Sequence, residues 1–97
     1  MTGYLIVNIE VRDPDAYAKY RQAAAPLVEK FGGRYLVRGG DIQPLEGDLG
    51  LKRLVVLEFP SVEGARRFYE SPEYAPVLKM RLESTKSDAV LVAGYQP

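Results

Sequence analysis

Apolar residues along the chain gather into four strand-like segments. These segments are rich in β-branched and apolar residues and bounded by turn-forming ones: Tyr4 to Val11 ("YLIVNIEV"), Arg34 to Arg38, Leu51 to Phe59 ("LKRLVVLEF") and Asp88 to Tyr95 ("DAVLVAGY"). The glycine pairs on either side of the second segment are separated by five residues, which matches no phosphate-binding motif. They are interpreted as the stop of a helix and the exit from a strand.

Helical periodicity fills the intervals between the first and second strands and between the third and fourth. Apolar residues recur at spacings of three and four at Tyr17, Tyr20, Ala24, Leu27 and Phe31. Asp13 is the expected N-cap of this helix, and Pro26 is expected to kink it or split it after Ala25. A later helix is expected to begin after Ser61, with a second segment that starts near Ser71 and runs to about Glu83.

The predicted order is therefore strand, helix, strand, strand, helix, strand. This order is typical of an α+β, ferredoxin-like βαββαβ domain with a four-stranded antiparallel sheet in the order four, one, three, two. Ninety-seven residues suit one domain spanning 1–97. Right-handed crossovers place both helical regions on one face of the sheet.

The strands are apolar on both faces. An antiparallel sheet with one solvated face should alternate apolar and polar residues, yet "YLIV", "LVVL" and "AVLVA" are apolar at successive positions. A monomer would expose a larger apolar patch than most monomers tolerate. The pattern predicts a homodimer that is formed through the sheet faces.

Alternation along each strand assigns side chains to the two faces. The expected helix-facing residues are Leu5, Val7, Ile9, Val55, Leu57, Phe59, Val90 and Val92. The expected partner-facing residues are Tyr4, Ile6, Asn8, Leu36, Arg38, Leu54, Val56, Glu58, Leu91, Ala93 and Tyr95. The polar members of the second set, Asn8, Arg38 and Glu58, lie on adjacent strands and should pair with one another or with a ligand.

Two interpretations of these polar residues stay open. Arg38 and Glu58 either form a structural salt bridge, or Arg38 anchors an anionic ligand while Glu58 acts as general acid or base and Asn8 orients the ligand. The side chains of Tyr17, Tyr20, Tyr69 and Tyr74 either pack in the core or line an aromatic-walled ligand pocket.

Composition narrows the chemistry. Thirteen basic and thirteen acidic residues cancel, and cysteine and histidine are absent. Thiolate nucleophiles, sulfur or histidine metal sites and a histidine-bound haem are therefore excluded, and we expect no metal and no cofactor.

Charge and sequence signals also narrow the partners and the compartment. Neither export nor membrane spanning is indicated, and a cytoplasmic location is expected. Lys52, Arg53, Arg66 and Arg67 are expected to be solvated. Nucleic-acid binding is disfavoured because the chain has no basic excess and its third strand lacks paired aromatic residues.

Four motifs, "DPDAYAKYR", "FGGRYLVRGG", "KRLVVLEFPS" and "SPEY", occur in this order along the chain. They resemble family thirteen-thirty of the domains of unknown function, within the dimeric α/β-barrel superfamily. The resemblance covers essentially the whole chain and implies a dimer of ferredoxin-like protomers. That family has no established activity, whereas relatives in the superfamily include isomerases, cofactor-independent monooxygenases and haem enzymes, which place ligands between the sheet and the helices or loops.

Two functions are consistent with these observations. One is a homodimeric protein that binds a small oxyacid-like molecule or acts on it without a cofactor. The alternative is a structural or protein-interaction dimer with no catalytic activity.

Overall fold

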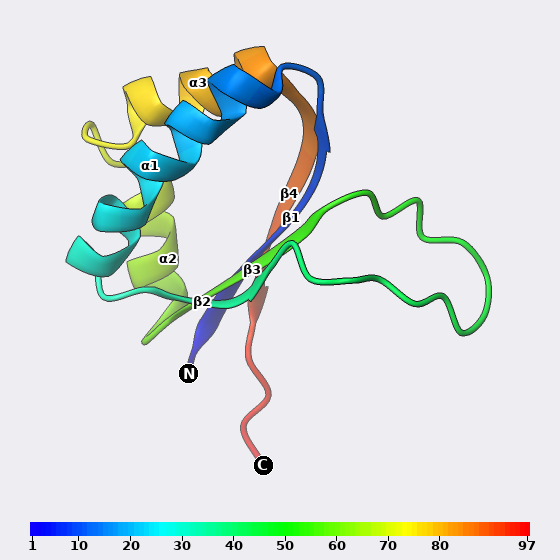
Figure 1. Cartoon of the computed structure of the whole chain (residues 1–97). Coiled ribbons are helices and arrows are strands. Elements are labelled where there is room, and N and C mark those ends of the chain that lie inside the picture. The colour runs from blue at the N-terminus through cyan, green and yellow to red at the C-terminus, as the bar shows by residue number, and fades with distance from the viewer.

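The computed structural model describes residues 1–97 as one antiparallel sheet backed by three helices (Figure 1). In chain order the elements are β1 (Gly3–Val11), α1 (Pro14–Lys30), β2 (Arg34–Arg38), β3 (Leu54–Phe59), α2 (Val62–Tyr69), α3 (Ala75–Ser84) and β4 (Thr85–Ala93). The strands follow the order β2-β3-β1-β4. The ferredoxin-like fold and the strand order predicted from the sequence are thus confirmed.

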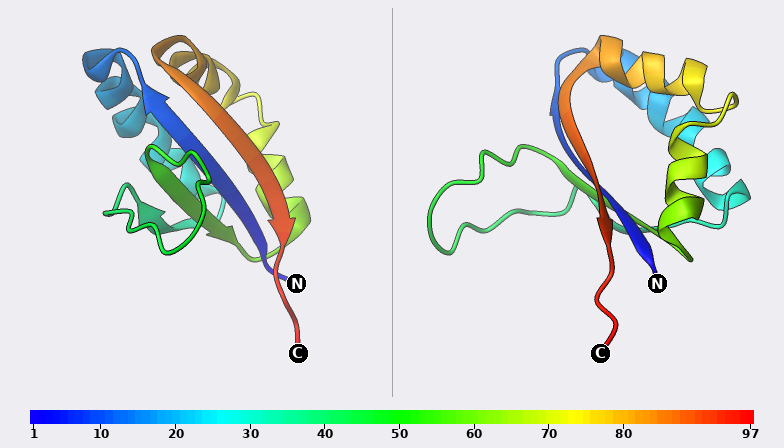
Figure 2. Two further views of the ribbon diagram at one scale, coloured as in Figure 1. Left: turned by 90° about the vertical axis from the view of Figure 1, so that its right-hand side faces the viewer. Right: turned by 180° about the vertical axis from the view of Figure 1, so that it is seen from behind.

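All three helices cover the same face of the sheet, and the other face is open (Figure 2). Leu5, Val7 and Ile9 of β1 alternate inward and pack with buried residues of the helices. Phe59 and Phe68, the most fully buried aromatic side chains, lie 5.3 Å apart between their ring centroids and join β3 to α2. The core therefore lies between the sheet and the helices.

Capping residues define where the helices begin and end. Asp13 Oδ1 accepts a hydrogen bond from the Ala16 amide at 3.1 Å, and Ser61 Oγ accepts one from the Gly64 amide at 2.9 Å. Gly32 follows the last turn of α1 with a φ of 81°, a conformation that glycine adopts at little steric cost. The predicted N-caps and the predicted helix stop are confirmed.

Pro26 does not divide α1, which continues as one helix to Lys30. The predicted split after Ala25 is wrong. Proline removes one intrahelical hydrogen bond, but Ala24 and Val28 on either side of it are both buried against the core. Tertiary packing of the two flanking turns holds the helix together across the proline.

The register of β4 differs from the predicted one by a single residue. Leu91 is opposite Leu5 and packs against the core, whereas Val90 and Val92 lie opposite Ile6 and Tyr4 on the open face. Val90 and Val92 therefore do not face the helices, and Leu91 does. Ala93 likewise lies opposite the buried Gly3, and Tyr95 is beyond the end of β4 and 89% exposed. Because successive residues of β4 are all apolar, alternation along the sequence cannot show which of them face the helices. The pairing of β4 with β1 determines it.

A β-bulge interrupts the pairing of β2 with β3. Tyr35 lies opposite Leu57 and Val37 opposite Val56, so Leu36 is an extra residue on β2. Because of this residue, Arg38 lies opposite Val55 and shares the helix-covered face with it. Without the bulge, alternation would have turned Arg38 to the open face.

The segment 39–53 between β2 and β3 is a long loop that projects from the open side of the sheet (Figures 1 and 2). Asn8 anchors its end, because its Nδ2 donates to the Gly50 carbonyl at 3.1 Å and its Oδ1 accepts from the Lys52 amide at 2.8 Å. Leu45 and Leu49 near its tip are 97% and 85% exposed. None of the helices has the length and apolar character needed to cross a membrane.

Candidate functional site

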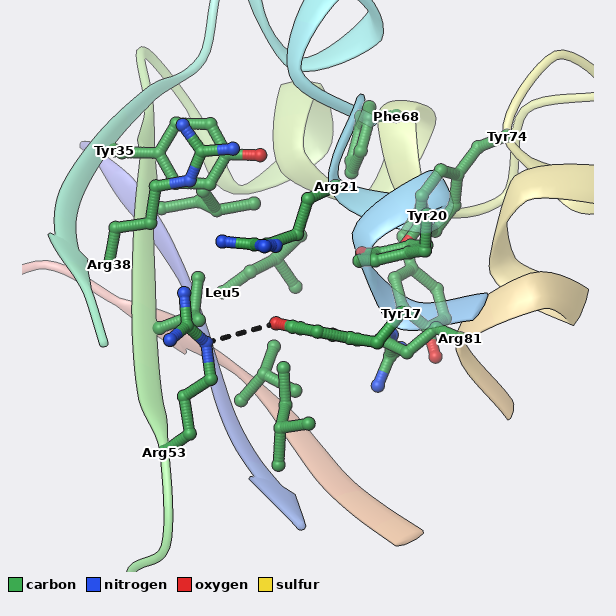
Figure 3. Close-up of a pocket in the computed structure, with 15 residues that line it drawn as sticks. Leu5, Tyr17, Tyr20, Arg21, Tyr35, Arg38, Arg53, Phe68, Tyr74 and Arg81 are labelled. Atoms are coloured by element: carbon green, nitrogen blue, oxygen red, sulfur yellow. Dashed lines mark hydrogen bonds between the residues drawn. The ribbon is translucent and has the colours of Figure 1, made fainter. Parts of the chain in front are cut away.

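A recess opens between the helix-covered face of the sheet and helices α1 and α3 (Figure 3). The space inside it that water can occupy is about 30 Å³, and about 480 Å³ when the open solvent at its mouth is included. The lining residues are Leu5, Val7, Ile9, Tyr17, Tyr20, Arg21, Tyr35, Arg38, Arg53, Val55, Leu57, Phe68, Tyr69, Tyr74 and Arg81. We call this recess the arginine cleft.

Four arginines and no carboxylate line the arginine cleft. They come from four places in the chain: α1, β2, the residue before β3, and α3. The ion pairs of the protein involve other arginines and a lysine, namely Arg12–Glu10, Lys30–Glu73, Arg34–Glu58 and Arg66–Glu70. In a chain of zero net charge, the cleft therefore has a local excess of positive charge.

Arg38 reaches the cleft because of the bulge at Leu36. Its guanidinium carbon lies 4.5 Å from the centroid of the Tyr35 ring, in a cation–π arrangement. It donates no hydrogen bond to another protein group. Stacking on one face leaves the N–H groups at the edge of the guanidinium available to an anion.

Glu58 is not a neighbour of Arg38, and their predicted pairing is wrong. Glu58 lies on the open face, where Arg34 Nε donates to its Oε1 at 2.8 Å and the Tyr4 hydroxyl donates to its Oε2 at 3.1 Å. The salt bridge expected in this part of the sheet thus exists, but with Arg34. Asn8 also faces the open side, and both of its amide atoms are bound to the 39–53 loop.

Arg53 was expected to be solvated, and this expectation is wrong. Its carbonyl accepts from the Ile9 amide at 2.8 Å, which continues the strand pairing one residue before β3. Its Nε donates to the Tyr17 hydroxyl at 3.1 Å. The guanidinium lies against Gly39, where φ is 74° and an added Cβ would collide with Nη1 of Arg53. A glycine at position 39 therefore makes room for Arg53 at the cleft.

Arg81 lies at the inner end of the cleft and is only 2% exposed. Its Nη1 donates to Ser87 Oγ at 2.7 Å, and its buried Nε has no hydrogen-bond partner. Burial by itself lowers the pKa of Arg81, but the nearby Tyr74 and Tyr20 hydroxyls outweigh this effect and the pKa is raised. A buried guanidinium without a carboxylate is costly, so its retention calls for an explanation.

The structure brings the four candidate tyrosines together around the cleft, as Figure 3 shows for Tyr17, Tyr20 and Tyr74. Tyr17 and Tyr20 are stacked with their centroids 5.7 Å apart, and the Tyr20 and Tyr74 hydroxyls share a hydrogen bond of 2.9 Å. Tyr69 packs on Tyr74 at 5.8 Å between centroids. Burial, then the charge and hydrogen bond of Tyr74, raise the pKa of Tyr20, so its hydroxyl stays protonated.

Sequence reasoning missed Tyr35, Arg21, Arg53 and Arg81 as members of the site. Arg21 stands one helical turn after Tyr17, and its guanidinium carbon lies 5.6 Å from the centroid of the Tyr17 ring. Arg53 has the same strand parity as Val55, which predicts the helix-covered face. Arg81 follows the buried Val77 by four residues on α3. These signals were present in the spacing, but only the fold shows that they meet.

Fold and site together define a ferredoxin-like protein with a cationic, tyrosine-walled cleft between its sheet and its helices. Residues 2–95 match the family described as "Domain of unknown function (DUF1330)", and the chain belongs to this family. The family resemblance noted from the sequence motifs is thus confirmed. Among curated proteins, none matches this chain.

Several solved structures share the fold at low sequence identity. RPA0582, a protein of unknown function from Rhodopseudomonas palustris, is 20% identical with a TM-score of 0.76, over 99% of this chain and 84% of that one. A dimeric ferredoxin-like protein of unknown function from Bacteroides fragilis is 17% identical with a TM-score of 0.66, over 96% of each chain. SnoaB from Streptomyces nogalater, a cofactor-independent oxygenase, is 13% identical with a TM-score of 0.63, over 99% and 95%.

Proposed function

We propose that the protein binds a small oxyacid in the arginine cleft, with Arg38 as the principal anchor of the anionic group. The observation that supports this most strongly is the gathering of four arginines without any carboxylate. Uncompensated like charges repel one another, and a bound anion removes that repulsion. The guanidinium group is also the side chain best suited to hold a carboxylate through two parallel hydrogen bonds.

The remaining walls of the cleft suit an apolar or aromatic body on the same ligand. Leu5, Val55 and Leu57 form its floor on the sheet, and tyrosine rings form its sides. The enclosed space of about 30 Å³ is close to the volume of one water molecule, so a ligand must displace arginine side chains from the mouth. Arg21 and Arg38 are exposed and can move in this way.

Chemistry within the cleft would rely on tyrosine and arginine. Glu58 is on the opposite face of the sheet, so this geometry does not support it as a general acid or base for a ligand held by Arg38. One of the Tyr20 and Tyr74 hydroxyls donates to the other, so the pair has one O–H left to donate to an oxyanion, and Arg81 can stabilise the charge. The cleft therefore has the groups needed to bind an enolate or phenolate and stabilise its charge, as a cofactorless enzyme must do. These groups support a role in binding more strongly than a role in catalysis.

We also propose that two copies pair through their open sheet faces. Val90 and Val92 are 54% and 43% exposed there, beside Ile6 and Val56. A second sheet would bury these side chains in the way that sheets pack face to face. The protein from Bacteroides fragilis that shares the fold is described as dimeric, which supports the pairing of two copies.

Thermal unfolding with and without millimolar benzoate tests the proposed binding. A ligand that binds only the folded state stabilises it by about 2.7 kcal/mol at one hundred times its Kd. We expect benzoate to raise the Tm of the wild type and of Arg34→Met, but not that of Arg38→Met. Arg34 is a matched control because it lies on the same strand and faces the opposite side. Absence of a shift across a panel of aromatic and aliphatic carboxylates would favour the alternative, a structural dimer without a ligand.

A further inference from the structure

The arginines of the cleft are divided into two groups. Arg21, Arg38 and Arg53 gather at one side of the recess, whereas Arg81 lies on the other side beside Tyr20 and Tyr74 (Figure 3). Tyr17 stands between the groups, and its hydroxyl accepts from Arg53. We call Arg21, Arg38 and Arg53 the mouth cluster.

The mouth cluster has more positive charge and more free donors than one carboxylate can use. Neither Arg21 nor Arg38 donates a hydrogen bond to another protein group, and Arg53 uses only its Nε. Each guanidinium carries five N–H donors. A monoanion would leave two of the three positive charges of the mouth cluster uncompensated.

The positions of the three guanidinium groups are built into the fold. The bulge at Leu36 turns Arg38 inward, Gly39 leaves space for Arg53, and the Tyr17 and Tyr35 rings support the guanidinium groups of Arg21 and Arg38. Solvated surface arginines need none of these arrangements. The fold therefore gathers three arginines around one recess before a ligand arrives, and the exposed side chains of Arg21 and Arg38 then move to admit the ligand.

We propose that the ligand carries two negative charges at one end, as a pair of neighbouring carboxylates or a phosphate monoester does, attached to an apolar body. This inference rests on the proposed function and specifies its ligand class. The dianionic end binds the mouth cluster, and the apolar body extends inward over Leu57 and the tyrosine rings. Arg81 and the Tyr20–Tyr74 pair at the inner end then meet an oxygen substituent of that body, where they can stabilise a developing negative charge.

Calorimetric titration with benzoate, phthalate and terephthalate at pH 8 tests the charge and its placement. All three are benzene carboxylates, and phthalate and terephthalate have the same net charge with the two carboxylates adjacent or opposite. We expect phthalate to bind at least about tenfold more tightly than benzoate, which is about 1.4 kcal/mol. Terephthalate should bind much like benzoate, because only one of its carboxylates reaches the mouth cluster.

Arg21→Gln is the variant that tests the cluster, because Arg21 is exposed on α1 and its replacement leaves the fold intact. It should weaken the binding of phthalate about tenfold and the binding of benzoate less than threefold, whereas Arg66→Gln on α2 should change neither affinity. Phenyl phosphate in place of phthalate distinguishes a phosphate from a pair of carboxylates, and tighter binding than benzoate supports the proposal with either probe.

Three results would overturn the inference in different ways. Equal affinities for benzoate, phthalate and phenyl phosphate would show a site for a single charge and leave the proposed function standing. Equal affinities for phthalate and terephthalate would show that the net charge of the ligand decides its affinity, and that two neighbouring charges at the mouth cluster do not. Failure of all of the probes to bind would reject the proposed function as well.

Discussion

Arg34 and Glu58 face each other across β2 and β3 on the open side of the sheet, with 2.8 Å between Nε and Oε1. Arg38, four residues further along β2, faces the other side and stacks on Tyr35. One strand of five residues thus supplies a structural ion pair to one face and the proposed ligand anchor to the other.

The Arg34–Glu58 pair should make a small contribution to stability. Arg34 is 71% exposed and Glu58 21% exposed, so we expect Arg34→Met to lower the free energy of unfolding by about 0.5–1 kcal/mol. Urea denaturation of Arg34→Met, Glu58→Gln and the double variant gives the coupling energy. The same cycle with Arg38→Met should give no coupling, and a larger coupling for Arg38 than for Arg34 would contradict the assignment.

A charge on the open face should separate the proposed dimer. Val56 lies opposite Ile6 and Val37 at the centre of that face, and Val56→Lys would bring two ammonium groups to an apolar interface. Sedimentation velocity should show a dimer for the wild type and for Lys79→Ala, whose side chain is exposed on α3, but a folded monomer for Val56→Lys. A monomeric wild type at micromolar concentration would reject the dimer.

Replacing Arg81 should stabilise the protein and weaken ligand binding. An apolar residue of similar volume often matches or exceeds the stability of a buried charged group, and Arg81 has a buried Nε without a partner. We expect Arg81→Met to raise the free energy of unfolding by about 1 kcal/mol. Urea denaturation measures this change. A loss of several kcal/mol would mean that Arg81 holds the fold together.

Stability should fall in alkaline solution because of Tyr20. Burial raises the pKa of Tyr20 above its ordinary value of about 10. Above pH 10 the unfolded chain therefore loses this proton while the folded chain keeps it, and the free energy of unfolding falls by up to about 1.4 kcal/mol per pH unit. Below pH 10 the contribution is fully present.

The Tyr20→Phe variant identifies the group that is responsible. It should show a shallower loss of stability between pH 10 and pH 11, measured by urea denaturation at each pH. Tyr95→Phe is the control and should retain the slope of the wild type, because Tyr95 is 89% exposed beyond the end of β4 and its replacement leaves the core unchanged. A Tyr20→Phe slope equal to that of the wild type would assign the effect to other tyrosines, such as Tyr35, whose pKa burial also raises.

Much of the fold could be predicted because its signals are local. Asp13 and Ser61 mark helix starts through their own side chains, and Gly32 marks a helix end through its own φ. The order of the elements then leaves few topologies. The face of β4 could not be predicted in the same way, because Val90, Leu91 and Val92 are equally apolar and only the pairing with β1 distinguishes them.

The candidate site was predicted in part, for a similar reason. The tyrosines were found because their helical spacing is regular, and Arg38 was found because it interrupts an apolar strand. Its face was predicted wrongly because a bulge depends on how two strands fit together, which the residues of one strand do not reveal. Arg53 differs from Arg38, because its position two residues before Val55 already places it on the helix-covered face. The expectation that neighbouring basic residues are solvated led to the wrong prediction.

The bulge at Leu36 also affects how relatives of this protein should be aligned. In a homologue with a regular second strand, the residue that points into the cleft would be the counterpart of Val37, and the counterpart of Arg38 would face the other copy. An ungapped alignment would then equate side chains that have different surroundings and different roles. In an ungapped alignment, an arginine in the Arg38 column is therefore evidence for a shared site only among homologues that keep the extra residue, and a homologue without it needs a one-residue gap at position 36.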